Sequence, residues 1–445
     1  MASSKDVNEG QSKSQLKREI SFFDIFFMSM GGQAPFLSLL SYGTAVFTVT
    51  LLFSPITVII GTIVVLFNGI AIYYLSSKFT MEGGYYTYAF YGLSKRLGLE
   101  TGWMYLFYSI LYGMGYIAGG TFVLKYALGL PPFEALFIIL IPALILLVLG
   151  IRPSTKYAIA AASLEVAILV AISLFFLNLA KFSFYDPFVK IPPASNIVAG
   201  VLFAIGLPTG YGSITPISGE VKDAKKAIGR TTLAVIITGG LLIALVVYSL
   251  LDAAVHVNFG ILSQYEPIID LVRNYLGLGG EVFLLFAAIN DGILASLAFM
   301  TAASRTLFTM ASHGFIPGNL DKISDNKPLR AVLTTAGIFA LLSTPLLVEN
   351  PYLIFLSLGT LAGLGNLFVH ASADFSLIKI SLKRLIKRLR QFTVGIVATI
   401  ISVSVLVYSI VTGAPDIAYI FFGWIIAGFL YSEILNMTKE EEEEE

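Results

Sequence analysis

Two acidic side chains lie deep inside apolar sequence, where a charge is costly and therefore informative. Glu165 stands within SLEVAILVAISLFF, and Asp291 stands within LLFAAINDGILASLAFM. An ionisable residue in a membrane-spanning helix marks a functional site by default, since burial in hydrocarbon disfavours its charged form. We therefore predict proton coupling at these two residues. A cation site or a structural hydrogen bond is the alternative for Glu165. Asp291 could also bind a substrate ammonium group or face an outer vestibule.

The other residue types exclude most alternative chemistry. The chain has three histidines without metal-ligand spacing and no cysteine, so we expect no metal site, no cofactor and no disulfide. A sodium site in the stretch around Asp291 would need paired hydroxyls, and Ser296 is the only hydroxyl there, which favours a proton over sodium. The net charge of zero gives no indication of nucleic acid binding. We expect three further polar residues to be structural or interfacial: Asn68, His370 and Asp374.

Two stretches rich in glycine and proline interrupt otherwise apolar sequence: MSMGGQAPFLSLLSYG (28–43) and GLPTGYGSITP (206–216). Glycine costs about 1 kcal/mol and proline about 3 kcal/mol in a helix interior relative to alanine. Non-helical backbone survives at membrane depth only against protein or a water-filled cavity. Close helix packing through small residues would explain either stretch alone. Interruptions at corresponding positions in the two halves of a chain, however, indicate a transporter binding site.

Each break would leave helix ends in the middle of the membrane, with free amides at one end and free carbonyls at the other. A zwitterionic substrate could bind both kinds of helix end, with its carboxylate at the amides and its ammonium group at the carbonyls. We expect a carboxylate at the amides around 32–34 and 210–213, and an ammonium group at the carbonyls near 30–31 and 207–209. The Tyr211 ring would either cover the pocket as a lid or simply pack against neighbouring side chains. The predicted substrate-binding residues are Met30, Gly31, Gly32, Gln33, Ala34, Leu207, Thr209, Gly210, Tyr211, Gly212 and Ser213.

The composition predicts the elements that position these residues. The chain is 56% hydrophobic and 13% charged, whereas a soluble domain carries about 25% charged residues, so we predict a polytopic membrane protein. Because a membrane-crossing helix needs about 20 mostly apolar residues, we expect about twelve spans. Their predicted ranges are 21–49, 55–77, 101–128, 133–150, 157–180, 196–218, 230–254, 281–310, 331–348, 351–378, 392–412 and 415–436.

The breaks fall in the first and sixth spans, five apart, so the second block of five must enter the membrane from the opposite side. This predicts an inverted repeat. Lysine and arginine cluster on one side of the predicted spans, which places both termini in the cytoplasm. Tyr85, Tyr86, Tyr88 and Tyr91 suit the headgroup zone, so we expect a cytoplasmic interfacial helix near 82–97. The predicted regions are a tail (1–20), the first repeat (21–180), the second repeat (195–378), a basic connector (379–390), two accessory helices (391–437) and an acidic tail (438–445).

Three stretches carry a resemblance to a known family: EGGYYTYAFYGLSKRLG (82–98), FAIGLPTGYGSITPISGEVKDAKKAIGRT (203–231) and AASRTLFTMASHGFIPGNLDKISDNKP (302–328). They resemble the amino acid–polyamine–organocation (APC) superfamily of transporters. The resemblance covers roughly residues 20–430. It implies an all-α membrane protein with a LeuT-type 5+5 inverted repeat, discontinuous helices 1 and 6, and two accessory helices. In that family the position of Glu165 often holds a lysine in place of a sodium ion, so the acid departs from the pattern.

Together these features predict a secondary active transporter of the plasma membrane, embedded in the lipid bilayer, that imports amino acids with protons by alternating access. Uncharged stretches in the third, sixth and tenth spans favour neutral over cationic substrates. A proton-independent exchanger, a polyamine or organic cation permease and a channel are the alternatives. No span carries the full-length polar stripe of a channel, and the nucleophile or metal cluster of an enzyme is missing. Few glutamines and no cysteine hint at a prokaryotic, thermophilic source.

Overall fold

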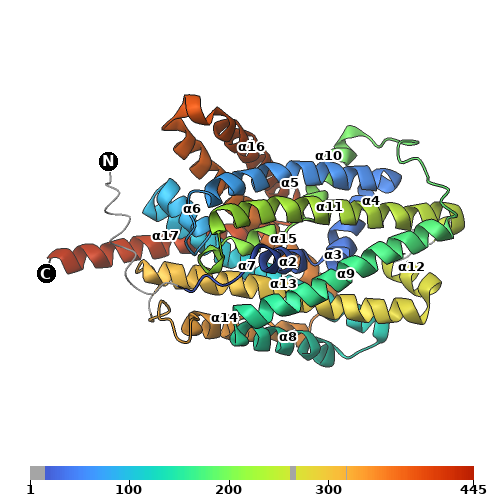
Figure 1. The fold of residues 1–445 in the computed structure, drawn as a ribbon, viewed down its shortest axis with the longest axis horizontal. Coiled ribbons are helices and arrows are strands. Elements are labelled where there is room, and N and C mark those ends of the chain that lie inside the picture. The colour runs from blue at the N-terminus through green and yellow to red at the C-terminus, as the bar shows by residue number, and fades with distance from the viewer. Residues whose placement is uncertain (1–15, 261–266, 317, 445) are drawn as a thin grey trace.

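The described part of the chain is helical. The computed structural model describes residues 16–444 apart from 261–266 and 317, and no β-strand occurs in this part. Most of the predicted tail 1–20 and the last residue of the acidic tail therefore lie outside the described residues. In Figure 1 most of the long helices run side by side, with α6 at one end of the bundle and α12 at the other.

The helices, in chain order, are α2 (Phe22–Gln33), α3 (Pro35–Ser38), η1 (Leu39–Gly43), α4 (Thr44–Thr50), η2 (Leu51–Phe53), α5 (Ser54–Ser76), α6 (Tyr85–Gly92), α7 (Lys95–Leu128), α8 (Pro132–Leu149), α9 (Ile151–Leu179), α10 (Ala194–Ala204), η3 (Tyr211–Ile214), η4 (Ser218–Glu220), α11 (Ala224–Val257), α12 (Pro267–Leu276), α13 (Leu278–Ser312), α14 (Leu329–Leu342), η6 (Thr344–Leu347), α15 (Pro351–Leu382), η7 (Leu385–Arg388), α16 (Leu389–Thr412) and α17 (Pro415–Glu444). The η elements are single turns of 3₁₀- or π-helix.

Ten stretches among the described residues are long and apolar enough to cross a membrane. The prediction of an all-helical membrane protein is thereby confirmed, while the count of twelve spans stays a prediction. One of the ten, Phe22–Ser76, has 55 residues, which far exceeds the about 20 that one crossing needs. Leu51, with φ of 49°, interrupts it between α4 and α5. The predicted sixth span contains α10, which is shorter than a crossing.

Local sequence explains where several helices begin and end. Ser21 and Asp24 form a capping box at the start of α2, in which the Ser21 amide donates to Asp24 Oδ2 over 2.7 Å. The α7 helix ends at Leu128 and is capped by Gly129, whose φ of 67° suits a residue without a side chain. Asn350 caps α15 by accepting the amide of Tyr352 over 3.0 Å, and Pro351 occupies the first helical position.

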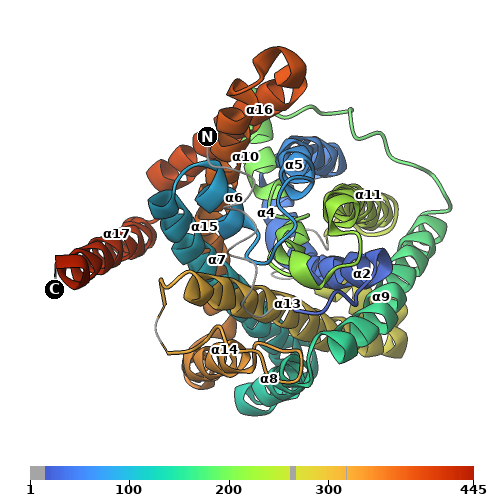
Figure 2. The ribbon, with the colours of Figure 1, turned by 60° about the vertical axis from the view of Figure 1, so that its left-hand side comes forward.

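The centre of the bundle is α7, which packs against α13 on one side and α15 on the other. Small residues bring the backbones together: a Cβ added at Gly120 of α7 would lie 2.6 Å from the carbonyl oxygen of Ala288 on α13. Beside this centre, α5 packs on α11, and α2 packs on α9 and α13. In both views α17 extends away from the bundle at its edge (Figures 1 and 2).

The short helix α6 occupies the range predicted for an interfacial helix, but its tyrosines are placed differently. Tyr85, Tyr86 and Tyr88 are at most 1% exposed, and of the four only Tyr91 is an exposed side chain. The expectation that these rings occupy the headgroup zone is therefore wrong for three of them. The reason is that α6 packs against α7 and α15, so its aromatic face is covered by protein.

Candidate functional site

The first break separates two helical pieces at Ala34. The α2 helix ends at Gln33, Ala34 has left-handed φ and ψ of 45° and 69°, and Pro35 starts α3. The Ala34 amide donates to the carbonyl of Gly31 over 3.0 Å. A non-glycine residue in this conformation is uncommon, and here the following proline prevents α2 from simply continuing. The predicted discontinuity of the first span is confirmed.

The second break is longer. The α10 helix ends at Ala204, and only turns of 3₁₀-helix occur before α11 begins at Ala224. Gly210 has φ of 123°, and a Cβ added there would lie 2.5 Å from the Gly32 carbonyl oxygen and 2.6 Å from the Gln33 nitrogen. The two breaks therefore touch backbone to backbone, which requires a glycine at this position.

Gln33 ties the two breaks together. Its side chain is buried, and Nε2 donates to the carbonyls of Pro208 over 2.9 Å and Val235 over 3.3 Å. A predicted substrate contact thus serves as a link between the first break, the second break and α11. The Oε1 atom of Gln33 has no hydrogen-bond partner among the described residues.

A row of hydroxyl groups joins α7 to both breaks. Tyr112 donates to the carbonyl of Thr209 over 2.9 Å, and its oxygen lies 3.0 Å from the hydroxyl of Tyr116. Tyr116 contacts Ser38 at 2.5 Å, and Ser38 donates to the carbonyl of Gln33 over 2.6 Å. Sequence reasoning named this stretch of the third span but missed the tyrosines. Their spacing of four residues, which places both on one face of a helix, was the available signal.

The predicted substrate-binding residues lie at the two breaks, where several backbone carbonyls are already occupied. All of them are buried. The carbonyls of Gly31, Pro208 and Thr209 accept hydrogen bonds from Ala34, Gln33 and Tyr112. Any ligand at the last two carbonyls has to share them with a side-chain donor or displace it. Gly32 and Gln33 also lie in the last turn of α2, where a helix leaves carbonyls rather than amides free.

The free amides of the first break belong to α3, and acids occupy them. Asp291 Oδ2 accepts the Leu37 amide over 2.9 Å. The Phe36 amide interacts with both Asp291 and Glu165. Both acids are at most 1% exposed. The predicted proton carriers thus hold the positive end of α3, a few residues beyond the amides around 32–34 where the sequence predicted a substrate carboxylate.

The two acids also contact each other. Asn290 Nδ2 donates to Glu165 Oε2 over 2.5 Å, and the Glu165 and Asp291 carboxyl groups are close neighbours that interact directly. Treated as carboxylates, each keeps one oxygen, Oε1 and Oδ1, without a donor. No lysine, arginine or histidine is among their partners in the described part of the chain. One proton between the two groups would supply the donor that this contact needs.

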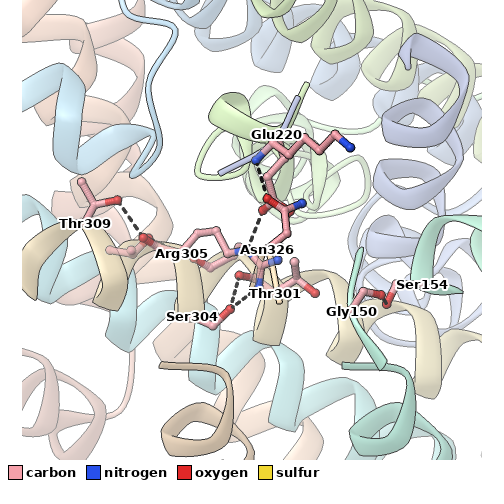
Figure 3. A network of polar contacts seen from close by, with 11 residues as sticks. Gly150, Ser154, Glu220, Thr301, Ser304, Arg305, Thr309 and Asn326 are labelled. Carbon is pink, nitrogen blue, oxygen red and sulfur yellow. Dashed lines mark hydrogen bonds and ion pairs between the residues drawn. The ribbon is translucent and has the colours of Figure 1, made fainter. Parts of the chain in front are cut away.

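A different buried acid closes the end of the bundle next to the N-terminal segment. Arg305 of α13 reaches Glu220, with Nε–Oε1 and Nη2–Oε2 distances of 2.7 Å and 3.2 Å (Figure 3). Both side chains are 2% exposed. Ser304 accepts a further hydrogen bond from Arg305 Nη1 over 3.0 Å. The sequence offered these residues only as parts of a family motif, and their pairing was not foreseen.

The N-terminal segment lies across this ion pair. The amides of Glu19 and Ile20 donate to the carbonyl of Glu220 over 2.9 Å and 3.1 Å, and the Lys222 amide donates to Ile20 over 2.8 Å. Nearby, burial raises the pKa of Glu82 above its usual range, and the charge of Glu220 adds to this effect. This end of the bundle is therefore closed by a charged pair and by main-chain hydrogen bonds.

A cavity of about 100 Å³ lies on the other side of the breaks. It is lined mainly by aromatic and small side chains, among them Tyr42, Tyr112, Tyr116 and Phe355. No charged residue lines it. The cavity thus adjoins the tyrosine row and offers an apolar environment next to the two breaks.

Comparison with known families agrees with this geometry. A family model described as "Amino acid permease" matches residues 24–440, which include both breaks, the two carboxyl groups and the Glu220–Arg305 pair. Among curated proteins no match was found.

Proposed function

Because the chain belongs to the amino acid permease family, within the APC superfamily, we propose that it imports neutral amino acids together with protons by alternating access. The family is one of amino acid transporters, and the many apolar helices make the chain a multi-pass membrane protein. The direction of transport, the coupling ion and the substrate class belong to the proposal. So do a plasma-membrane location with cytoplasmic termini and a prokaryotic, thermophilic source.

The contact between Glu165 and Asp291 is the observation that carries proton coupling. Two carboxyl groups can hydrogen-bond only when one of them is protonated. The pair then holds one negative charge at the start of α3, where the helical turn favours an anion. Removing the proton would bring two like charges into contact in a buried site, which is strongly unfavourable. The pair is therefore suited to bind and release one proton.

Proton binding would be linked to the first break through Leu37. Asp291 accepts a hydrogen bond from the Leu37 amide, so any change in the charge of the pair alters the strength of its interaction with α3. A second proton would neutralise the pair and weaken its attraction to the free amides. The outer half of the first span would then be freer to move. This link gives the proton a route to influence the substrate site, because α3 follows directly on Ala34.

Sodium is a weaker candidate for the coupling ion. The Ser296 hydroxyl donates to the carbonyl of Gly292 over 2.6 Å and is thereby turned toward its own helix. The described residues contain no cluster of three or more acidic or histidine side chains that could hold a metal ion. The proton therefore remains the coupling ion of the proposal.

The substrate site would lie where the breaks meet. Its ammonium group would take the carbonyls of Pro208 and Thr209 from Gln33 and Tyr112. Its side chain would enter the aromatic cavity, whose lack of charge favours a neutral, apolar amino acid. With the Glu220–Arg305 end closed and the cavity beyond the breaks, we assign the structure to a state that is closed toward the cytoplasm.

Uptake into proteoliposomes tests this function. A labelled mixture of neutral amino acids is supplied in sodium-free buffer, with an acid-outside gradient imposed or absent. We expect accumulation that requires the gradient and disappears in Glu165→Gln, while exchange against preloaded amino acid persists. Asp416→Asn, a change at an exposed acid at the start of α17, serves as the control and should behave like the unmodified chain.

Other results would redirect the proposal. Uptake that ignores the gradient but requires preloaded amino acid would identify an exchanger and remove the coupling role of Glu165. Uptake of amines in place of amino acids would identify an organic cation permease. A flux that does not saturate with substrate would indicate a channel.

A further inference from the structure

A second buried acid without a basic partner lies away from the Glu165–Asp291 pair. Asp374 is on α15, one turn after His370, and is fully buried. Ser402 of α16 donates to it, and Asn68 of α5 lies next to Ser402. Both of these helices pack against α15. Sequence reasoning expected Asn68, His370 and Asp374 to be structural or interfacial.

The cluster around Asp374 has more hydrogen-bond acceptors than donors. The Ser402 hydroxyl lies 3.3 Å from Asn68 Oδ1 and 3.5 Å from Asp374 Oδ2, and its single proton can serve only one of these acceptors. Asp374 Oδ1 has no partner among the described residues. His370 turns its Nε2 to the hydroxyls of Tyr211, at 2.9 Å, and Tyr85, at 3.3 Å. Its Nδ1 is without a partner in the same part of the chain.

An ionised carboxylate is poorly accommodated in this cluster. Burying a charge without a partner is costly, and the described surroundings of Asp374 supply one long hydrogen bond and no cation. A proton on Asp374 removes the charge and adds the missing donor, which Asn68 Oδ1 or Ser402 Oγ can accept. The titratable groups that face the cluster are His370 on the same helix and Tyr211 and Tyr85 from η3 and α6. Around Tyr85 lie further tyrosines: Tyr88, Tyr105 and Tyr108.

Asp252 provides an internal comparison. It is also fully buried and also has a histidine one turn away, at His256. Its Oδ1 accepts the Tyr185 amide over 2.8 Å and lies 3.2 Å from His256 Nδ1. Asp252 therefore has a main-chain donor and a nearby imidazole, whose Nδ1 also lies 2.9 Å from the Asp252 carbonyl. Asp374 has only the long contact from Ser402, because His370 points toward the tyrosines instead.

The cluster is connected to the second break. The Asn68 side chain lies next to the hydroxyl of Tyr211, the ring that the sequence analysis placed over the substrate site. Tyr211 in turn contacts His370. A donor at Asp374 would fix Asn68, and through it Tyr211, at the point where the sixth span is interrupted.

We propose that Asp374 is a second proton-binding site, enclosed by Asn68 and Ser402, and that its proton holds Tyr211 in place at the second break. The site is separate from the Glu165–Asp291 pair and does not depend on which substrate is transported. It rests on the proposed function only in that Tyr211 borders the substrate site.

Infrared spectroscopy of the purified full chain tests the protonation directly. The carbonyl stretch of a carboxylic acid is resolved from that of a carboxylate, so at neutral pH it reports buried protonated acids. We expect Asp374→Asn to lose one such band that Glu165→Gln and Asp252→Asn retain. Replacing choline chloride by sodium chloride should leave the band unchanged. A spectrum unaltered by Asp374→Asn would overturn the proposal, and a band removed by sodium would identify a cation site instead.

Hydrogen exchange tests the link to the second break. Asp374→Asn keeps a neutral donor and should leave amide exchange in 205–216 close to that of the unmodified chain. Asp374→Ala removes the donor, and we expect about tenfold faster exchange in the same segment. Ser402→Ala, which leaves the carboxyl in place, should shift the infrared band without removing it. Equal exchange in the Ala and Asn variants, both folded, would contradict a role for the proton at Tyr211.

Discussion

Glu220 and Glu165 are both buried glutamates beside a helix break, yet their partners differ. Glu220 receives two charged hydrogen bonds from Arg305 at the end of the second break. Glu165 accepts a hydrogen bond from the side-chain amide of Asn290 and faces a second acid, Asp291, at the first break. The first arrangement balances its charge within the protein. The second has no basic partner in the described residues and is balanced only when a proton is present.

The difference assigns separate tasks to two similar side chains. A buried acid paired with arginine keeps its charge, because neutralising it would leave the arginine unpaired. Such a pair can close a path, and it opens only when the helices that carry its members separate. A pair of acids changes its charge with each proton that enters or leaves. We therefore interpret Glu220–Arg305 as a lock on the cytoplasmic side and Glu165–Asp291 as the proton-sensitive element.

Removing the arginine gives the largest expected effect. Arg305→Met keeps an apolar chain of similar length but leaves Glu220 buried without its partner. Breaking a buried ion pair costs about 3 to 5 kcal/mol. We expect the free energy of unfolding to fall by about that amount, measured by denaturant unfolding of the purified protein.

The double variant Arg305→Met/Glu220→Leu is the matched control. It removes both charges, and replacement of a whole buried pair by apolar residues is often nearly neutral. We expect it to recover most of the lost stability. If the single variant were as stable as the unmodified chain, Glu220 would not depend on Arg305 as described.

Replacing one acid of the pair by an amide should abolish coupling. In Asp291→Asn the new amide can donate to Glu165, so no shared proton is needed. One charge moving through about 100 mV provides about 2.3 kcal/mol, or about fiftyfold accumulation. We expect gradient-driven accumulation to fall from this range toward equilibration, while exchange continues, in proteoliposome uptake assays. Full accumulation in this variant would remove Asp291 from the coupling mechanism.

A smaller change weakens the lock without breaking it. Ser304→Ala removes the hydroxyl that accepts from Arg305 Nη1. The loss of one hydrogen bond to a charged group lowers stability by about 1 to 3 kcal/mol. Ser312→Ala, at an exposed position on the same helix, should change it by less than about 0.5 kcal/mol. Equal effects of the two changes in thermal unfolding would show that Ser304 does not support the pair.

The smallest effect concerns pH at Glu82, next to the lock. Burial raises the pKa of this half-buried carboxyl in the folded protein, so its charged form is disfavoured on folding at neutral pH. The unfavourable contribution is present above the folded pKa and disappears as the pH falls below the usual glutamate range. We expect Glu82→Gln to raise the melting temperature slightly at neutral pH. The difference should vanish in acid, and a difference independent of pH would contradict the assignment.

The sequence predicted the features that depend on local residue chemistry. Glycine and proline cannot continue a helix, so both breaks were placed correctly, and the motifs of three stretches were enough to indicate the family. Glu165 and Asp291 could each be selected because an acid in apolar sequence is unusual. The count of about twelve spans goes beyond the ten stretches found among the described residues.

The contacts between distant segments could not be predicted in the same way. Glu165 and Asp291 belong to different helices, α9 and α13, and only the packing of these helices against each other and against α2 brings their carboxyl groups together. The same limit applies to Glu220 and Arg305, and to the tyrosines of α6, whose burial depends on α7 and α15. For these the residue types were visible in the sequence, but the helix face that each would turn inward was not.

The most direct test of the central claim is to follow protons during transport. Proteoliposomes with a trapped pH indicator are given a neutral amino acid without any imposed gradient. Our interpretation predicts that the interior acidifies as the amino acid enters, and that Glu165→Gln exchanges amino acid without acidification. Equal acidification in the variant and the unmodified chain would show that the proton moves by another route, and the role assigned to the carboxyl pair would be wrong.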